Sequence, residues 1–259
     1  VSPGTRERGT GMSGLTVGSL FSGIGGLDLG LERAGMNVIW QSEIDPFASR
    51  VLARHWPTVP NLGDITTIDW SSVERPDLIC GGYPCQPFST AGKQLGAADP
   101  RHLWPVMLDA VRVLRPRYVL IENVAAHLRL GFDRVLCDLD ESGFDAEWSL
   151  VSACSVGAPH LRRRLFCVAY PHGAGRGGLE ERDLWPATGI EAPLGHDADR
   201  QSLDRERSWN EGRPGSLGMA DGLPGWVERR RALGNAVVPQ VAELIGRRIT
   251  AHASLAPAS

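Results

Sequence analysis

The chain has 259 residues, 42% of them hydrophobic and 22% charged, which is typical of a globular protein with one main core. No apolar run approaches the roughly 18 residues of a membrane helix, and the opening stretch lacks the apolar segment of a signal peptide, so we expect a soluble cytoplasmic protein. A net charge of −3 excludes an overall basic surface, although arginines cluster at residues 162–164 and 229–231.

Five cysteines form no CxxC pair and no spacing typical of Cys/His metal ligands, so we expect no structural zinc and no other metal site. An odd number of cysteines without a signal peptide indicates reduced thiols.

Short apolar runs alternate with helical patterns along the first two thirds of the chain, which predicts an α/β fold with a largely parallel, doubly wound sheet. Asp45 and Pro46 fit the N-cap and first position of a helix, and Pro239 fits the start of the closing helix. The expected strands are residues 15–21, 37–43, 77–82, 118–124, 146–153 and 164–170, and the other expected helices are residues 25–35, 102–116 and 132–143.

The first strand runs into "FSGIGG", where Gly23, Gly25 and Gly26 are expected to turn the chain tightly and to let it approach a ligand closely. This spacing is not the GxGxxG of a dinucleotide fold, because Asp28 stands three residues beyond Gly25. A carboxylate there would repel a pyrophosphate, which disfavours NAD and FAD. The loop alone could equally be a plain turn.

Two acidic residues extend this pattern. Glu43 closes the second predicted strand, a position from which an acid binds ribose hydroxyls, and Asp64 is expected at a further strand end. Each alone could be an ordinary surface acid. Together with the glycine loop they favour an adenosine-bearing cofactor without a diphosphate, such as S-adenosylmethionine.

The stretch "GGYPCQPFST" places Cys85 between Pro84 and Pro87. A lone cysteine is more often a small buried hydrophobe, but two prolines favour a stiff, extended loop that could present a nucleophile.

Seven segments, in this order along nearly the whole chain, resemble the DNA cytosine-5 methyltransferases of bacteria and phages: "FSGIGG", "EID", "GDI", "GGYPCQPFS", "ENV", "RRRLF" and "GNAVVP". The resemblance implies a Rossmann-like fold that uses S-adenosylmethionine, a cytosine flipped out of duplex DNA and a covalent cysteine adduct.

The resemblance also implies catalytic roles. Cys85 would attack C6 of cytosine, and Glu122 of "ENV" would supply a proton or hydrogen bond at N3. Arg164 would contact the cytosine O2 and the DNA backbone, whereas Arg162 would hold the catalytic loop and Glu122 in place. The chain departs from the family pattern at His160, where a glutamine is usual, and at Tyr83, where a proline is typical.

For the cofactor, the resemblance places Phe21 against the adenine, Glu43 at the ribose, and Asp64 with Ile65 at the adenine edge. Asp99 and Leu103 would line the methionine end. The implied cofactor residues are Phe21, Ser22, Gly23, Gly25, Gly26, Glu43, Ile44, Asp64, Ile65, Pro84, Leu103, Asn235 and Ala236, and the implied substrate residues are Gln86, Ser89, Asn123, Val124 and Arg164.

On this basis we expect a disordered leader over residues 1–13, a catalytic S-adenosylmethionine-binding domain over 14–170, a small target-recognition region over 171–224, a segment over 225–251 that packs back beside the first helix, and a tail over 252–259. The recognition region is irregular and rich in Gly, Pro, Asp and Arg. Its arginines at 200, 205, 207 and 213 could read guanine edges, or the region could be a shrunken remnant.

The expected partner is double-stranded DNA, with a cognate restriction endonuclease as a possible second partner, and we expect a monomer. Two alternatives remain open at this point. One is an RNA cytosine-5 methyltransferase, because the same pocket could hold a base flipped from either polymer. The other is a non-catalytic DNA-binding relative.

Overall fold

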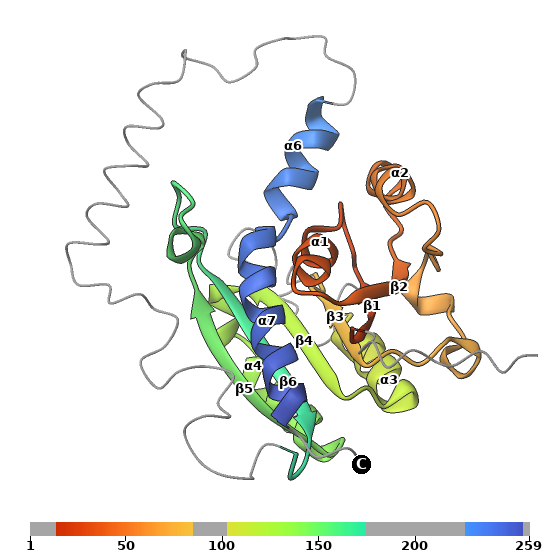
Figure 1. Ribbon diagram of the computed structural model, residues 1–259, viewed down its shortest axis with the longest axis vertical. Coiled ribbons are helices and arrows are strands. Elements are labelled where there is room, and N and C mark those ends of the chain that lie inside the picture. Colours follow the sequence, from red (N-terminus) through yellow and green to blue (C-terminus); the bar gives the residue numbers. More distant parts are fainter. Residues whose placement is uncertain (1–13, 85–102, 175–225, 256–259) are drawn as a thin grey trace, which may run out of the picture.

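The computed structural model describes residues 14–84, 103–174 and 226–255 (Figure 1). These residues form a six-stranded sheet in the order β2-β1-β3-β4-β6-β5. The strands are β1 (Thr16–Leu20), β2 (Asn37–Ser42), β3 (Leu78–Gly81), β4 (Tyr118–Val124), β5 (Phe144–Val151) and β6 (Arg164–Pro171).

Strands β1 to β4 pair in parallel, and β6 runs antiparallel to both of its neighbours, β4 and β5. The predicted α/β fold with a largely parallel sheet is therefore confirmed. The strand order turns back between β1 and β3, which is the position where ligands bind to open α/β sheets.

Helices cover both faces of this sheet. Apolar side chains of α3 (Trp104–Leu114) and α4 (Phe132–Glu141) pack on one face, and those of α1 (Gly26–Arg33) and α7 (Pro239–Leu255) pack on the other. Figure 1 shows α1 and α7 together in front of the sheet. The remaining elements are α2 (Pro46–His55), α6 (Trp226–Asn235) and the short helices η1 (Ile65–Thr67), η2 (Trp70–Ser72), η5 (Ala125–Arg129) and η6 (Ala153–Val156).

The closing helix α7 returns to α1, as expected. A Cβ on Gly30 of α1 would lie 2.4 Å from the Cβ of Ala242, so the absence of a side chain at Gly30 lets the two helices approach closely. Helix α7 begins at Pro239 as predicted and continues to Leu255, four residues past the predicted end of the closing segment. The wider division into domains stays a prediction.

Helix α2 also begins as predicted. The Asp45 carboxylate accepts hydrogen bonds from the backbone N–H groups of Phe47 and Ala48, each at 2.9 Å, and Pro46 occupies the first turn.

One expectation differs from the structure, and one helix was not expected. Asp64 does not follow a strand: its segment makes one isolated bridge between Gln41 and Asn61, and Asp64 then caps η1. Helix α6 carries no apolar stripe in the sequence, so the pattern gave no reason to expect it. None of the described helices is both long and apolar enough to cross a membrane.

Candidate active site

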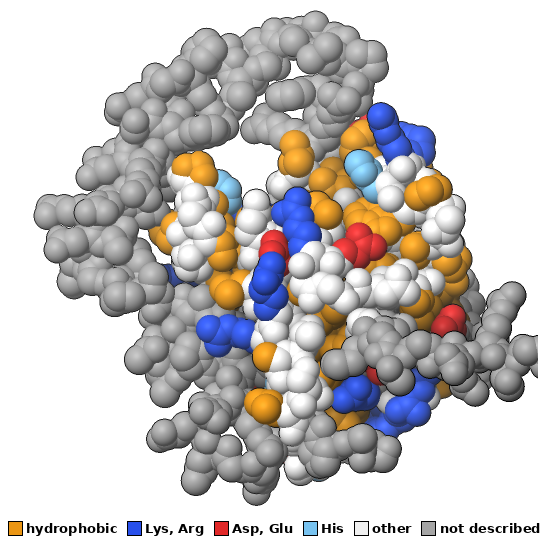
Figure 2. All heavy atoms as spheres, viewed as in Figure 1, with side chains coloured by type: hydrophobic (Ala, Val, Ile, Leu, Met, Phe, Trp, Pro, Cys, Tyr) orange, Lys and Arg blue, Asp and Glu red, His pale blue; other side chains and the backbone are white. Residues whose placement is uncertain are grey.

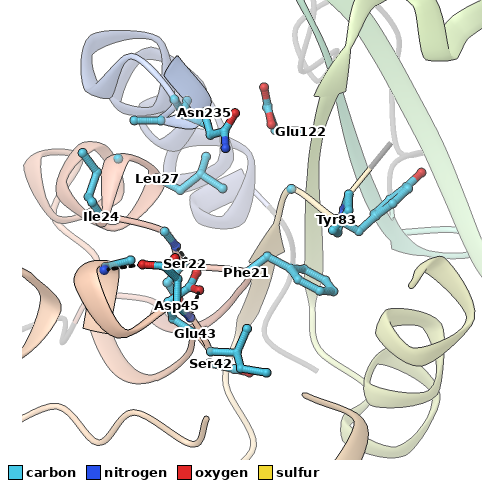
Figure 3. A pocket seen from close by; sticks show the side chains of 18 of the residues that line it. Phe21, Ser22, Ile24, Leu27, Ser42, Glu43, Asp45, Tyr83, Glu122 and Asn235 are labelled. Carbon is cyan, nitrogen blue, oxygen red and sulfur yellow. Dashed lines mark hydrogen bonds between the residues drawn. The ribbon is translucent and has the colours of Figure 1, made fainter. Parts of the chain in front are cut away.

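The carboxyl ends of the four parallel strands β1 to β4 meet at one edge of the sheet and open onto a cavity of about 740 Å³ (Figure 3). The segments that follow these strands line it, together with the start of β6 and the turn between α6 and α7. In Figure 3, Glu122 and Asn235 lie at one end of the cavity and Glu43 and Asp45 at the other, with Phe21 between them.

The structure brings most of the predicted site residues to this cavity. The predicted residues that line it are Phe21, Ser22, Gly23, Gly26, Glu43, Ile44, Asp64, Ile65, Pro84, Leu103, Glu122, Asn123, Val124, Arg164, Asn235 and Ala236. Gly25 and Arg162 are not among the described lining residues. Cys85, Gln86, Ser89 and Asp99 lie outside the described residues, but Pro84, which directly precedes Cys85, is exposed at the cavity.

The loop after β1 is held against the end of β2 by one carboxylate. The backbone N–H of Gly23 donates to Oε2 of Glu43, and the N–H of Asp45 donates to its Oε1, both at 2.7 Å. Each Glu43 oxygen thus has one backbone donor and further acceptor capacity. The loop itself is tightly turned, with φ of 52° at Phe21 and 56° at Gly23.

Two of the three glycines expected to approach a ligand also lie against other parts of the protein. A Cβ on Gly25 would lie 2.4 Å from the Trp56 ring, and one on Gly26 would lie 2.5 Å from the carbonyl oxygen of Val237. Gly25 also has φ 81°, in the left-handed region, so its expected role in the turn is confirmed. The expected close approach of Gly25 to a ligand stays a prediction, and at Gly26 the small residue admits the C-terminal segment.

Asp28 does not face the cavity, contrary to the argument that its charge would repel a pyrophosphate there. It is fully buried, and its carboxylate accepts hydrogen bonds from Gln41 Nε2 at 2.8 Å and from Ser19 Oγ at 3.1 Å. Burial raises the pKa of Asp28 to about 6, against the opposing effect of these hydrogen bonds. Asp28 therefore joins helix α1 to strands β1 and β2 through buried hydrogen bonds.

Glu122 and Arg164 form the charged pair of the site. Val124 of β4 pairs with Arg164 of β6, and Glu122 stands two residues back on the same face of the sheet. Arg164 Nε lies 3.3 Å from Glu122 Oε1. Burial raises the pKa of Glu122 to about 7, although the charges of Arg164 and Arg162 oppose this shift, so the carboxyl group can carry a proton near neutral pH.

Arg162 makes contacts that were not expected from the sequence. Its guanidinium Nη2 donates to the carbonyl oxygens of Gly234 at 2.8 Å and Ala236 at 2.7 Å, so it fixes the turn between α6 and α7. The charge of Arg162 also acts on Glu122, opposing the rise of its pKa, while the ion pair with Glu122 is made by Arg164; the expected role of Arg162 in holding the catalytic loop and Glu122 stays a prediction.

The cavity has further lining residues that were not predicted as site residues. Most are next to predicted residues in the chain, whereas Glu228 and Ala232 come from α6, a helix without an apolar stripe that could have predicted it. They are Ile24, Leu27, Ser42, Asp45, Ala48, Gly63, Thr66, Gly82, Tyr83, Glu228, Ala232, Gly234 and Val237.

The described cysteines do not supply a nucleophile at this cavity. Cys80, Cys137, Cys154 and Cys167 are free thiols, and none of them is among the lining residues. Burial raises the pKa of Cys80 and of Cys167, which keeps both protonated. Within the described ranges, no group of three or more His, Cys, Asp or Glu side chains could hold a metal ion.

Comparison with known proteins identifies the family. The family profile of the C-5 cytosine-specific DNA methylases matches residues 15–184. The type II methyltransferase M.NaeI of Lentzea aerocolonigenes is 31% identical over an alignment of 315 positions that covers 93% of this chain and 76% of M.NaeI. The type II methyltransferase M.HgiCII of Herpetosiphon aurantiacus is 37% identical over 157 residues, which are 58% of this chain and 36% of M.HgiCII, so the chain spans about a third of that relative.

Solved structures show the same fold. A variant of Spodoptera frugiperda DNMT2 is 26% identical, with a TM-score of 0.53 over 61% of this chain and 50% of that one. The Dnmt2 methyltransferase of S. pombe covers 93% of this chain and 98% of its own, with a TM-score of 0.55; at 17% identity it bears on the fold alone. With the matching family profile and the M.NaeI alignment, the conclusion is that this chain belongs to the C-5 cytosine-specific DNA methylase family.

Proposed function

We propose that the protein transfers a methyl group from S-adenosylmethionine to C5 of a cytosine rotated out of duplex DNA, through a transient bond between the Cys85 sulfur and C6. The observation that carries this proposal is the meeting, in one cavity, of Glu122 with its Arg164 partner and of Pro84, the residue before Cys85. The names of the relatives M.NaeI and M.HgiCII, both type II methyltransferases, support it.

The residues at the other end of the cavity fit an adenosine group. Glu43 offers carboxylate lone pairs for ribose hydroxyls, and Phe21 offers an aromatic surface for the adenine. At Gly23 the space beside the backbone is open, since a Cβ there would meet no atom closer than the Phe21 carbonyl oxygen at 4.0 Å. When bound, S-adenosylmethionine supplies an electrophilic methyl group on sulfur.

Cytosine must be activated before its C5 can accept a methyl group. Its C5 is a weak nucleophile until the Cys85 thiolate adds to C6 and makes the ring enamine-like, while a proton from Glu122 at N3 offsets the developing charge. C5 then takes the methyl group and loses its proton to the solvent. The bond between Cys85 and C6 breaks, which restores the ring and the thiolate, and the proton at N3 returns to Glu122. A carboxyl group with a pKa near 7 can donate and recover a proton at neutral pH.

Double-stranded DNA is the proposed substrate, with base flipping as the route by which the cytosine reaches the cavity. We assign target recognition to residues 171–224, and we propose a bacterial or phage protein that works as a monomer in the cytoplasm, with a restriction endonuclease as its functional counterpart. On the face shown in Figure 2, basic and acidic side chains are interspersed among the described residues, so we do not assign DNA binding to that face.

The test is to incubate the protein with labelled S-adenosylmethionine and either pooled random-sequence duplexes or folded RNA, and then to locate 5-methylcytosine by chemical conversion and sequencing. We expect methylation of DNA within one short sequence motif. Transfer to RNA alone would replace DNA by RNA as the substrate. DNA binding without any transfer would instead support a non-catalytic relative.

A further inference from the structure

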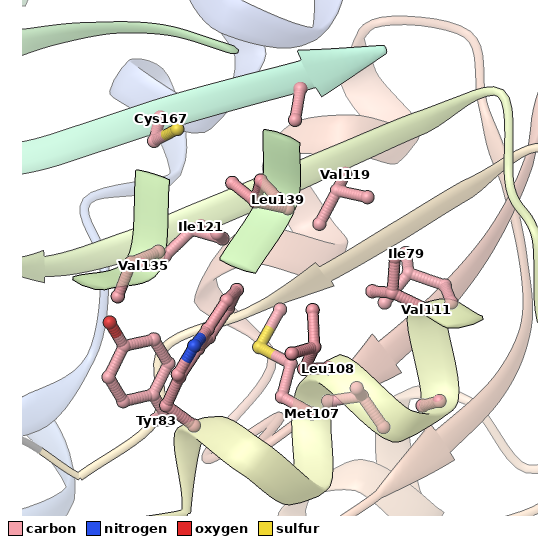
Figure 4. Packing of buried hydrophobic residues seen from close by; sticks show 14 of the residues in the cluster. Ile79, Tyr83, Met107, Leu108, Val111, Val119, Ile121, Val135, Leu139 and Cys167 are labelled. Carbon is pink, nitrogen blue, oxygen red and sulfur yellow. The ribbon is translucent and has the colours of Figure 1, made fainter. Parts of the chain in front are cut away.

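Tyr83, two residues before Cys85, is fixed at three points. Its hydroxyl oxygen lies 2.6 Å from His127 Nε2, and its carbonyl oxygen accepts a hydrogen bond from Asn123 Nδ2 at 3.2 Å. Its ring packs against Trp104, with ring centroids 5.4 Å apart. Tyr83 is 3% exposed and His127 is 1% exposed, so the bond between them is shielded from water. Figure 4 shows Tyr83 at the border of the drawn apolar side chains, on the side of Val135.

The direction of the buried bond follows from its second partner. His127 Nδ1 lies 2.9 Å from the carbonyl oxygen of Leu130, which can only accept a hydrogen bond. Nδ1 therefore carries the hydrogen, and in the neutral ring Nε2 is the acceptor for the Tyr83 hydroxyl. The bond joins the segment after β3 to η5, the turn that follows Glu122, Asn123 and Val124 on β4.

This anchor lies between two parts of the active site. On its N-terminal side, a Cβ on Gly82 would lie 2.7 Å from Glu122 Oε2, so the chain passes directly against that carboxyl group. On its C-terminal side, Pro84 has a fixed φ and restricts Tyr83 to extended conformations. Tyr83 and Pro84 are the last described residues before Cys85, so the orientation of the Tyr83 peptide sets the direction in which the described chain leads toward Cys85.

We propose that the hydrogen bond from Tyr83 to His127 positions Cys85 for attack on the cytosine, so that Tyr83 and His127 are positioning residues of this reaction. This inference rests on the proposed role of Cys85 as the nucleophile. A displacement of about 1 Å at a reacting atom is enough to lower a rate substantially.

Four variants separate the hydrogen bond from the packing around it. Tyr83→Phe keeps the ring and removes the hydroxyl. His127→Asn retains a donor near Nδ1 for the Leu130 carbonyl and loses the acceptor for Tyr83, whereas His127→Gln retains an acceptor near Nε2. Tyr118→Phe is the matched control, because the Tyr118 hydroxyl makes the same kind of buried bond to His252 Nδ1, at 2.8 Å, at the opposite end of β4.

The measurements are kcat and KM on a duplex that carries the sequence found with the random pool, and hydrogen–deuterium exchange of the backbone amides of Cys85 and Gln86. We expect Y83F and H127N to lower kcat about tenfold, with the KM for DNA and the Kd for S-adenosylmethionine within about twofold of the wild-type values. The same two variants should speed exchange at Cys85 and Gln86. The double variant should be no slower than either single one.

The controls distinguish positioning from general destabilisation. H127Q should recover a kcat within about threefold of wild type, and Y118F should lower the melting temperature while its kcat is unchanged. Full kcat in both Y83F and H127N, or equal exchange in all variants, would overturn the inference. If the wild-type protein methylates nothing, the proposed function fails, and the exchange comparison still decides whether the pair fixes Cys85.

Discussion

Arg164 lies 3.3 Å from Glu122 because β6 runs in the direction opposite to the rest of the sheet. Its reversed course brings the first residue of β6 to the edge where the parallel strands end, opposite Val124 at the end of β4. The side chains of Arg164 and Glu122 then project from the same face into the cavity. The charge of the Arg164 guanidinium lowers the pKa of Glu122, but burial raises it more, so the pKa is about 7.

This pair predicts an alkaline limit to the reaction. Because burial raises the pKa of Glu122, the group is protonated below about pH 7 and loses its proton above it. An acid that must donate at N3 works only in its protonated form, so kcat/KM should fall above about pH 7. Glu122→Gln should remove this limit and lower kcat by roughly 10²- to 10⁴-fold, measured by methyl transfer from pH 5.5 to 9.

Glu74→Gln, at an exposed position outside the cavity, is the control for the change of charge. The assignment of Glu122 as the acid fails if E122Q keeps the same alkaline limit as the wild-type protein.

Cys85→Ala tests the covalent step. The variant should lose methyl transfer completely, because none of the described thiols lines the cavity to add to C6 in place of Cys85, while the affinity for S-adenosylmethionine stays near the wild-type value. Transfer assays and calorimetry with S-adenosylmethionine measure the two quantities separately. Cys137→Ala, which removes an exposed thiol on α4, is the matched control. Full activity in C85A would contradict the covalent mechanism.

Arg162→Ala should weaken cofactor binding. The side chain holds the carbonyl oxygens of Gly234 and Ala236, and both residues line the cavity together with Asn235. Loss of two charge-assisted hydrogen bonds should raise the Kd for S-adenosylmethionine on the order of tenfold. Calorimetry with the DNA-free protein gives the value, and Arg163→Ala, an exposed neighbour, is the control. Equal affinities in R162A and wild type would show that this turn does not shape the cofactor site.

The periodicity of apolar residues predicted most helices and strands, because each of these signals lies within a short stretch of the chain. The strand over Tyr118–Val124 and the capped helix after Asp45 each carry their signal within a few residues. The motif segments likewise follow strand ends that parallel pairing brings to one edge, so most of the predicted residues meet in one cavity.

The features that could not be predicted from the sequence depend on contacts between residues that are distant in the chain. No local signal reports that Asp28 is buried against Ser19 and Gln41, or that Gly26 admits Val237 from the far end of the chain. Helix α6 was missed because its residues show no apolar period, although Glu228 and Ala232 reach the cavity. The hydrogen bonds from Arg162 to Gly234 and Ala236 were not foreseen for the same reason, since they depend on where the α6–α7 turn lies.

The buried Asp28 predicts a stability that depends on pH. Its pKa is raised to about 6 in the folded protein from 3.8, so the native state holds a proton that the unfolded state has lost between these values. The stability that this group contributes is therefore complete below about pH 4 and is lost as the pH rises through about 6. At pH 7, the charged Asp28 lowers the free energy of unfolding by about 3 kcal/mol relative to a neutral side chain at the same place.

Asp28→Asn is neutral at every pH and can still accept from Gln41 while it donates to Ser19 Oγ. Between pH 4 and pH 7, the free energy of unfolding of D28N should rise relative to that of wild type by about 2 to 3 kcal/mol. Urea unfolding at several pH values measures this difference, with Asp109→Asn at an exposed site on α3 as the control for the lost charge. A difference that stays constant with pH would mean that Asp28 keeps its charge in the fold, stabilised by Ser19 and Gln41 against the effect of burial.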